Sequence, residues 1–92
     1  MNIIARRYTA DNRAVYVHED GDLTTSFGVY FRGATVKKDV QLSLLIADEA
    51  QLFDAKEIGT LIRAAKDLAK KGPILPGELR ALATKRLEAQ NT

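Results

Sequence analysis

Residues 53–73, FDAKEIGTLIRAAKDLAKKGP, decide the fold because they encode a helix together with both of its ends. Asp54 and Glu57 have the spacing of a capping box, which satisfies the backbone amides of a first helical turn. Gly72 and Pro73 suit the other end, since glycine adopts the left-handed conformation after a last turn and proline cannot continue a helix. This stretch therefore predicts a helix.

One face of this helix is apolar and the opposite face is basic. Apolar residues recur every three or four positions, so they share a face that must be buried against another element. They are Ile58, Leu61, Ile62, Ala65, Leu68 and Ala69. The basic face holds Lys56, Arg63, Lys66 and Lys70. Two interpretations of that face stay open, a solvated helix back and a contact surface for an anion.

Composition favours one small folded domain. The chain has 92 residues, 46% of them hydrophobic, which is enough for a modest core and too apolar for a disordered chain. We expect a single domain over residues 1–92. Without cysteine there is neither a disulfide nor a thiol nucleophile. The start, MNIIARRYTA, lacks the pattern of a secretory signal and no stretch is long enough to span a bilayer, so we expect a cytoplasmic protein without membrane contacts.

Charge is distributed unevenly along the chain, although the net charge is only +2. Residues 63–86 hold seven basic residues against two acidic ones, and residues 39–57 hold five acidic residues against one lysine. Such a pattern is compatible with docking onto a partner of mixed charge. It falls short of the strongly basic footprint of a dedicated nucleic-acid binder.

The first part of the chain predicts an antiparallel meander. Three runs indicate strands: residues 2–9, 14–18 and 23–32. The segments 10–13 and 19–22 have turn chemistry, and the second contains an Asp-Gly step. Within the third run, Gly28 is expected to mark a bulge or a close approach.

Two further elements complete the predicted fold. Residues 40–46 alternate in a way that favours a fourth strand, although a helix over residues 36–47 also fits their spacing. Pro76 suits the first position of a second, shorter amphipathic helix that runs to about Gln90. We expect an α+β domain of two layers, in which an antiparallel meander of three or four strands is followed and covered by two amphipathic helices.

Residues that carry chemistry are sparse. His18, the only histidine, stands beside Glu19 and Asp20 near a turn, where an exposed hairpin residue is more typical than a base or metal ligand. The Asp-Gly-Asp run at 20–22 lacks the spacing and distal glutamate of a calcium loop. No glycine-rich phosphate loop opens a helix. The sequence therefore favours a protein that is not an enzyme and holds no metal or cofactor.

Aromatic residues and arginines are interleaved in the predicted strands. They are Tyr8, Tyr16, Tyr30 and Phe31, with Arg6, Arg7, Arg13 and Arg32. In one interpretation the sheet binds nucleic acid, by entering a major groove or by stacking on single-stranded bases. In the other, the aromatic residues fill the packing face and the arginines pair with acids of the hairpins, namely Asp11, Glu19, Asp20 and Asp22.

The meander YTADNRAVYVHEDGDLTTSFGVYFRG at residues 8–33, followed by a basic helical half, resembles small phage-encoded anti-CRISPR proteins of the type I-F group. The resemblance implies an inhibitor that binds the RNA-guided surveillance complex in the infected bacterium and blocks recognition of target DNA, without catalysis or cofactor. The implied partners are CRISPR-associated proteins and the guide RNA backbone, with no small-molecule substrate. These proteins share no diagnostic motif, so the resemblance assigns no residue a role.

Under this hypothesis, two charged sets are expected to contact the partner, because the complex exposes lysine-rich DNA channels together with RNA phosphates. The set expected to contact anions is Arg32, Lys37, Lys38, Arg63, Lys66 and Lys70. The set expected to meet lysines is Glu19, Asp20, Asp22, Asp48 and Glu49. The alternative function is a small sheet-type nucleic-acid-binding or phage accessory protein.

Overall fold

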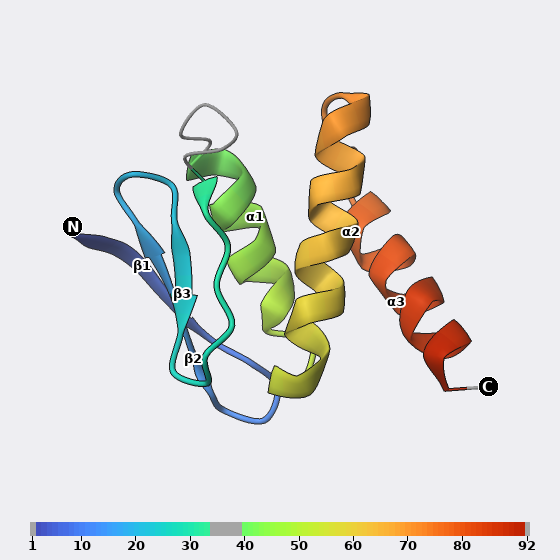
Figure 1. Ribbon diagram of the computed structural model, residues 1–92, viewed down its shortest axis with the longest axis horizontal. Helices are drawn as coiled ribbons and strands as arrows, with labels where there is room; N and C mark the ends of the chain where they lie inside the picture. The colour runs from blue at the N-terminus through green and yellow to red at the C-terminus, as the bar shows by residue number, and fades with distance from the viewer. Residues whose placement is uncertain (1, 34–39, 92) are drawn as a thin grey trace.

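A computed structural model describes residues 2–33 and 40–91, and it confirms an α+β fold (Figure 1). An antiparallel sheet of three strands comes first, and three α-helices follow it within the described part of the chain. The strands are β1 (Ile3–Tyr8), β2 (Ala14–His18) and β3 (Leu23–Thr25), adjacent in chain order. The helices are α1 (Val40–Ala50), α2 (Ile58–Lys71) and α3 (Glu78–Gln90).

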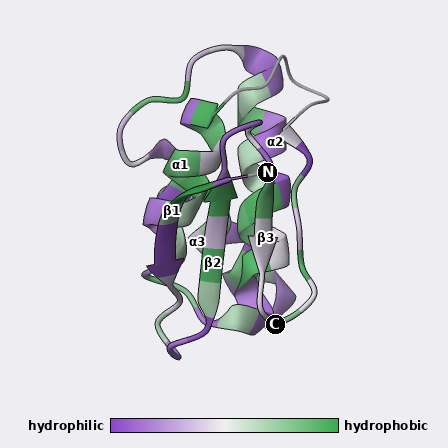
Figure 2. Ribbon diagram, turned by 90° about the vertical axis from the view of Figure 1, so that its left-hand side faces the viewer, coloured by the Kyte–Doolittle hydropathy of each residue, from purple (hydrophilic) through white to green (hydrophobic). Residues whose placement is uncertain are grey.

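The helices of the described chain lie on one side of the sheet (Figures 1 and 2). Helix α1 packs on β1 and β2, α2 packs on α1, and α3 packs mainly on α2. The core between these elements is fully buried at Val15, Val17 and Leu23 of the sheet, Ile46 of α1 and Leu61 of α2. Removal of this apolar surface from water is the main force that holds the layers together.

Helix α2 confirms the prediction for residues 53–73. Asp54 and Glu57 form the capping box, with the Asp54 amide donating to Glu57 Oε1 at 2.7 Å. A 3-10 turn, Ala55–Glu57, leads into the helix. The predicted apolar face is buried at its first two turns and partly buried beyond them. Gly72 follows the last turn with a φ of 133°, a backbone conformation that favours glycine.

The predicted fourth strand is wrong, because residues 40–46 belong to α1. The buried side chains of this helix recur at the helical period and face β1 and β2; they are Leu42, Ser43, Ile46, Ala47 and Ala50. The alternation that favoured a strand depended on Val40 and Leu44, which are only partly buried. The competing helix prediction gave the right type from residue 40 onward, and residues 34–39 lie outside the described part of the chain.

The third strand is shorter than the predicted run 23–32. It ends at Thr25, the chain reverses through Gly28, and Phe31 pairs back with Leu23 through backbone hydrogen bonds of 2.8 and 2.9 Å. The Thr25 hydroxyl donates to the Val29 carbonyl and accepts from the Val29 amide. Gly28 has a φ of 87°, and a Cβ atom there would meet nothing within 4 Å, so it forms a turn rather than the predicted bulge or close approach.

Helix α3 starts two residues later than predicted and ends at Gln90 as expected. Gly77 stands before it in the left-handed conformation, with a φ of 80°. Pro76 therefore lies outside the helix, not at its first position. The Glu78 side chain accepts a hydrogen bond from the Leu75 amide at 3.0 Å, which fixes the start of the helix.

Three segments meet at what we call the Gly21–Gly33 junction. The Ser43 hydroxyl of α1 donates to the Gly21 carbonyl in the β2–β3 turn, and the Gly33 amide donates to Asp22 Oδ1 at 2.9 Å. A Cβ atom on Gly33 would lie 2.2 Å from the Gly21 carbonyl oxygen, so only glycine fits there. The junction ties α1 to the sheet and to the segment that follows Gly28.

Strand β1 forms one edge of the sheet and carries an irregularity near its start. The pairing register with β2 shifts between Ile3 and Ala5, as in a β-bulge. Ile3 and Ile4 are about half exposed, at 48% and 50%. This end of the edge strand therefore departs from regular pairing geometry.

Candidate functional site

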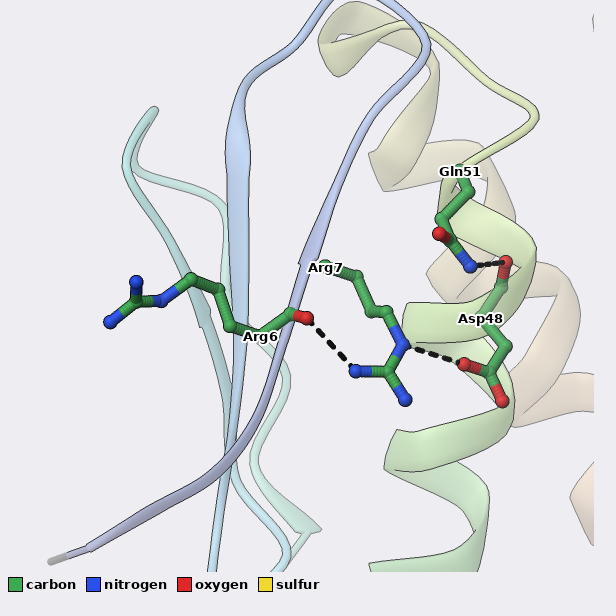
Figure 3. Close-up of polar contacts among 4 residues, drawn as sticks. All are labelled: Arg6, Arg7, Asp48 and Gln51. Atoms are coloured by element: carbon green, nitrogen blue, oxygen red, sulfur yellow. Dashed lines mark hydrogen bonds and ion pairs between the residues drawn. The ribbon is translucent and has the colours of Figure 1, made fainter.

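The two adjacent arginines of β1 point to opposite sides of the sheet (Figure 3). Arg7 reaches the helix side, where its Nε donates to Asp48 Oδ1 of α1 at 3.0 Å. Arg6 points away from α1, and its guanidinium carbon lies 5.8 Å from the centre of the Tyr16 ring. The strand thus contributes Arg7 to an ion pair with α1 and Arg6 to the outer face of the sheet.

The outer face of the sheet carries an aromatic and polar row. Arg6, Tyr16 and Thr24 are cross-strand neighbours, and a ring nitrogen of His18 lies 2.8 Å from the Thr24 hydroxyl. Tyr8 is 46% exposed. His18 is therefore a partly buried member of a hydrogen-bonded pair.

The aromatic residues are divided between the core and the surface, and nucleic-acid binding by the sheet stays a prediction. Phe31 is buried as the packing interpretation predicts, whereas Tyr8 and Tyr30 are exposed. No salt bridge joins Arg6 or Arg13 to a hairpin acid within the described residues, and these arginines lie over rings, Arg6 over Tyr16 and Arg13 over Phe27. The Arg13 charge still acts on Asp11, whose pKa is lowered by the Thr9 hydroxyl first and by Arg13 to a smaller extent.

The acids of α1 already have partners within the chain. Asp48 pairs with Arg7, and Glu49 accepts from Arg80 Nε at 2.9 Å with only 13% of its side chain exposed. The hydrogen bond from Arg80 to Glu49 also raises the pKa of that guanidinium. These acids, predicted to meet lysines of a partner, thus first hold α1 to β1 and to α3.

The hairpin acids Glu19, Asp20 and Asp22 lie together at the β2–β3 turn. Asp20 Oδ1 accepts from the Asp22 amide at 3.1 Å, and Asp22 accepts from the Gly33 amide. Both bonds use carboxylate oxygens to shape the turn. Their proposed role toward partner lysines stays a prediction.

The structure brings together three members of the predicted anion-contacting set. Arg63, Lys66 and Lys70 are exposed on α2. Lys66 Nζ lies 6.0 Å from the centre of the Phe31 ring, which places α2 beside the segment that carries Arg32. Arg32 in turn lies over Tyr30, at 5.7 Å. Lys37 and Lys38 lie outside the described residues.

A hollow of about 450 Å³ opens between the segment around Phe27 and the start of α2. It is lined by Phe27, Val29, Ala55, Lys56, Gly59, Thr60, Arg63 and Gln90. The Arg63 guanidinium and the Gln90 amide each donate to the Thr60 hydroxyl at 3.2 Å. Arg13 borders the hollow, with its guanidinium carbon 5.8 Å from the centre of the Phe27 ring.

We call these cations the basic seam: Lys56 and Arg63, which line the hollow, and Arg13 and Lys66, which lie over the Phe27 and Phe31 rings. No acidic residue lines the hollow, and the four cations form no salt bridge within residues 2–33 and 40–91, although the Arg13 charge acts on nearby Asp11. Positive charges gathered along a concave surface focus the field and raise the local concentration of anions. The seam is therefore the candidate functional site.

Sequence reasoning missed two seam residues as site members. Arg13 fitted two interpretations, a nucleic-acid contact on the sheet and a pair with hairpin acids. Neither placed it beside Phe27, because the chain reversal at Gly28 was not recognised. Lys56 belonged to the predicted basic helix face but was left out of the contact set. The positive φ available to Gly28 was the signal that would have placed Phe27 in a turn.

Two other features concern metal ions and membranes, again within residues 2–33 and 40–91. No group of three or more histidine or acidic side chains is arranged to hold a metal ion there. Within the same ranges, no helix combines the length and apolar character required to cross a membrane.

Comparison with known proteins gives no match. No family model fits the chain, and no significant similarity to a curated protein or a solved structure is found. The candidate site is thus described from its own geometry.

Proposed function

We propose that the protein is a non-enzymatic inhibitor that binds the RNA-guided surveillance complex of the type I-F CRISPR system and blocks recognition of target DNA. The observation that carries this proposal is the separation of charge on the surface, with the basic seam beside α2 and an acidic β2–β3 turn. A surveillance complex exposes lysine-rich DNA channels and RNA phosphates together, so it offers a complement to both. The resemblance of residues 8–33 to anti-CRISPR proteins supports the same assignment.

Ion pairs within the chain indicate which charged residues are available to a partner. Asp48 and Glu49 are engaged by Arg7 and Arg80, so contact through them requires breaking an existing pair. The seam cations and the acids of the β2–β3 turn need no such rearrangement. We therefore expect the seam and this turn to dominate binding to the complex.

The test is capture of labelled target duplex by a purified type I-F complex in the presence of increasing amounts of the protein. Loss of capture at a molar ratio near one is the expected result, since a surface-occupying inhibitor acts by stoichiometry. Reversal of charge at the exposed Glu19 should weaken inhibition, whereas the same change at the exposed Glu88 of α3 should not. Undiminished capture with the protein in excess would rule out the inhibitor.

A second candidate function, direct binding of duplex DNA through the sheet, is favoured by the outer face. Arg6 over Tyr16 and the exposed ring of Tyr8 form a cationic and aromatic surface on that face. Gel shifts against random duplex DNA at low and moderate salt separate the two functions. Duplex binding that falls steeply with salt and is lost in Arg6→Gln supports the second function.

A further inference from the structure

We propose that the basic seam is a binding site for the phosphodiester backbone of a single nucleic-acid strand, separate from the outer face of the sheet. The proposal does not depend on a surveillance complex, because a free oligonucleotide tests it directly. It rests on the placement of the seam cations, on the lining of the hollow and on the aromatic rings beside it.

The first step concerns charge. The seam joins Arg13 of the β1–β2 turn to Lys56 of the 3-10 turn and to Arg63 and Lys66 of α2, and no carboxylate lines the hollow. Each phosphate of a strand carries one negative charge, so a row of cations of this kind displaces several condensed counterions on binding. The ligand that fits is a polyanion rather than a single anion.

The second step concerns length. The segment from Phe27 to Phe31 bridges the ends of the seam, with Arg13 over the first ring and Lys66 over the second. Four residues extend at most roughly 13 Å, and the turn at Gly28 makes the actual span shorter. The cations at the two ends are thus associated with different rings, so the seam is extended along the surface. Such a surface suits an extended polyanion better than a compact anion.

The third step concerns the kind of strand. A cationic groove flanked by aromatic rings is the arrangement by which proteins bind single strands, because unpaired bases stack on the rings. Phe27 lines the hollow and is only partly buried, whereas the exposed Tyr30 lines a different hollow with Asp22 and Thr24. A duplex keeps its bases stacked inside and gains nothing from the Phe27 ring. Thr60 and Gln90 add polar groups at the floor of the hollow.

The fourth step concerns preorganisation. Arg63 is held by the Thr60 hydroxyl, and Arg13 and Lys66 rest against rings, so these side chains lose less conformational freedom on binding than free cations do. Arginine also matches a phosphate with two parallel donors. These features distinguish the seam from an ordinary solvated lysine surface.

The experiment measures fluorescence anisotropy of labelled oligo-dT and oligo-U twenty-mers at several salt concentrations. The seam variant is R13Q/R63Q/K66Q. Its matched control is K71Q/K85Q/R86Q, which removes three cations of α2 and α3 that lie outside the seam, one of them an arginine held by Asp67. Circular dichroism and thermal melts confirm that both variants fold.

We expect binding of at least one oligonucleotide, and the tighter of the two identifies the strand. The seam variant should lose affinity about tenfold or more and show a salt slope smaller by about 2, since each lost contact lowers it by about 0.7. Phe27→Leu, which removes the ring but keeps an apolar side chain, should also weaken binding, by about tenfold, through lost stacking. The control should stay within about twofold of the wild type.

Three results would overturn the proposal. One is equal loss in the seam variant and its control, which means that only net charge matters. Another is tighter binding of duplex DNA than of either single strand. The third is displacement of the oligonucleotide by polyglutamate of equal total charge as effectively as by an unlabelled strand, which would make an acidic protein surface the occupant.

Discussion

Helices α1 and α2 both stand on the same side of the sheet, but they meet it in different ways (Figure 1). Helix α1 lies directly on β1 and β2 and buries five side chains. Its acids Asp48 and Glu49 form ion pairs with Arg7 and Arg80. Helix α2 meets the segment from Phe27 to Phe31 across a hollow, and its cations there stay outside the ion pairs of the described residues.

The two contacts therefore contribute to different properties of this small domain, one to stability and the other to binding. A closed contact stabilises the fold through buried apolar area and paired charge, and leaves little for a partner to use. The contact across the hollow contains cations without ion-pair partners, so it adds little stability, and its positive field remains able to attract an anionic ligand. Substitutions at the α1 contact should therefore change the stability of the fold, and substitutions at the hollow beside α2 should change ligand binding.

The largest expected effect is on the closed side, from Ile46→Ala. Ile46 is fully buried, so the change removes apolar contacts and leaves a cavity, which should lower the free energy of unfolding by about 2–5 kcal/mol. Urea denaturation followed by circular dichroism measures it. Gln41→Ala, at an exposed position of the same helix, should change stability by less than about 0.5 kcal/mol. A loss below about 1 kcal/mol at Ile46 would contradict the closed packing.

The Gly21–Gly33 junction gives the next largest effect. Gly33→Ala forces a methyl group against the Gly21 carbonyl, and the backbone shift should lower the free energy of unfolding by about 1–3 kcal/mol. Gly59→Ala on the open side should do the opposite and add about 0.5–1 kcal/mol, because only the flexible end of Arg63 is near. Equal effects of the two changes, measured by thermal melts, would show that the junction is not tight.

Paired and unpaired charges give a smaller contrast. Glu49→Gln weakens a mostly buried carboxylate that accepts from Arg80, and should cost about 1 kcal/mol after allowance for the exposed arginine. Arg63→Gln, in the seam, should stay within about 0.5 kcal/mol of the wild type. Chemical denaturation of both variants in parallel tests the contrast. A larger loss at Arg63 than at Glu49 would reverse the assignment of the two sides.

The smallest expected effect is on the stability of the protein at low pH. The Thr9 hydroxyl and then the Ala55 amide hold the pKa of Asp11 below its ordinary value. A lowered folded pKa means that this contribution is complete above about pH 4 and is lost as the pH falls through the folded value. Thermal melts between pH 2 and 6 should therefore show a shallower acid limb in Asp11→Asn than in the wild type. An unchanged limb would mean that the carboxylate does not tie the β1–β2 turn to residue 55.

The helix at residues 53–73 was predictable because its signals are local. The capping pair Asp54 and Glu57, the three- and four-residue apolar spacing and Gly72 all act within a few residues of each other. Helix α1 was not predictable in the same way. Its mostly apolar sequence fits two periods, and only packing of Leu42 and Ile46 against the sheet decides between them.

The candidate site was predictable only in part, for a related reason. Arg63 and Lys66 share a helix face, which periodicity alone reveals. Arg13 joins them only because Gly28 turns the chain and brings Phe27 between the sheet and α2. A contact between residues of two different turns depends on the tertiary fold, and no local pattern encodes it.

The register shift near Ile4 has a consequence for how the molecule behaves at high concentration. An edge strand such as β1 offers unpaired backbone groups on which a neighbouring molecule can add a strand of its own, and exposed isoleucines would favour this. A bulge twists the edge out of line, and the arginines that follow repel an identical strand. We expect the chain to resist fibril formation, and a variant without the irregularity to lose that resistance.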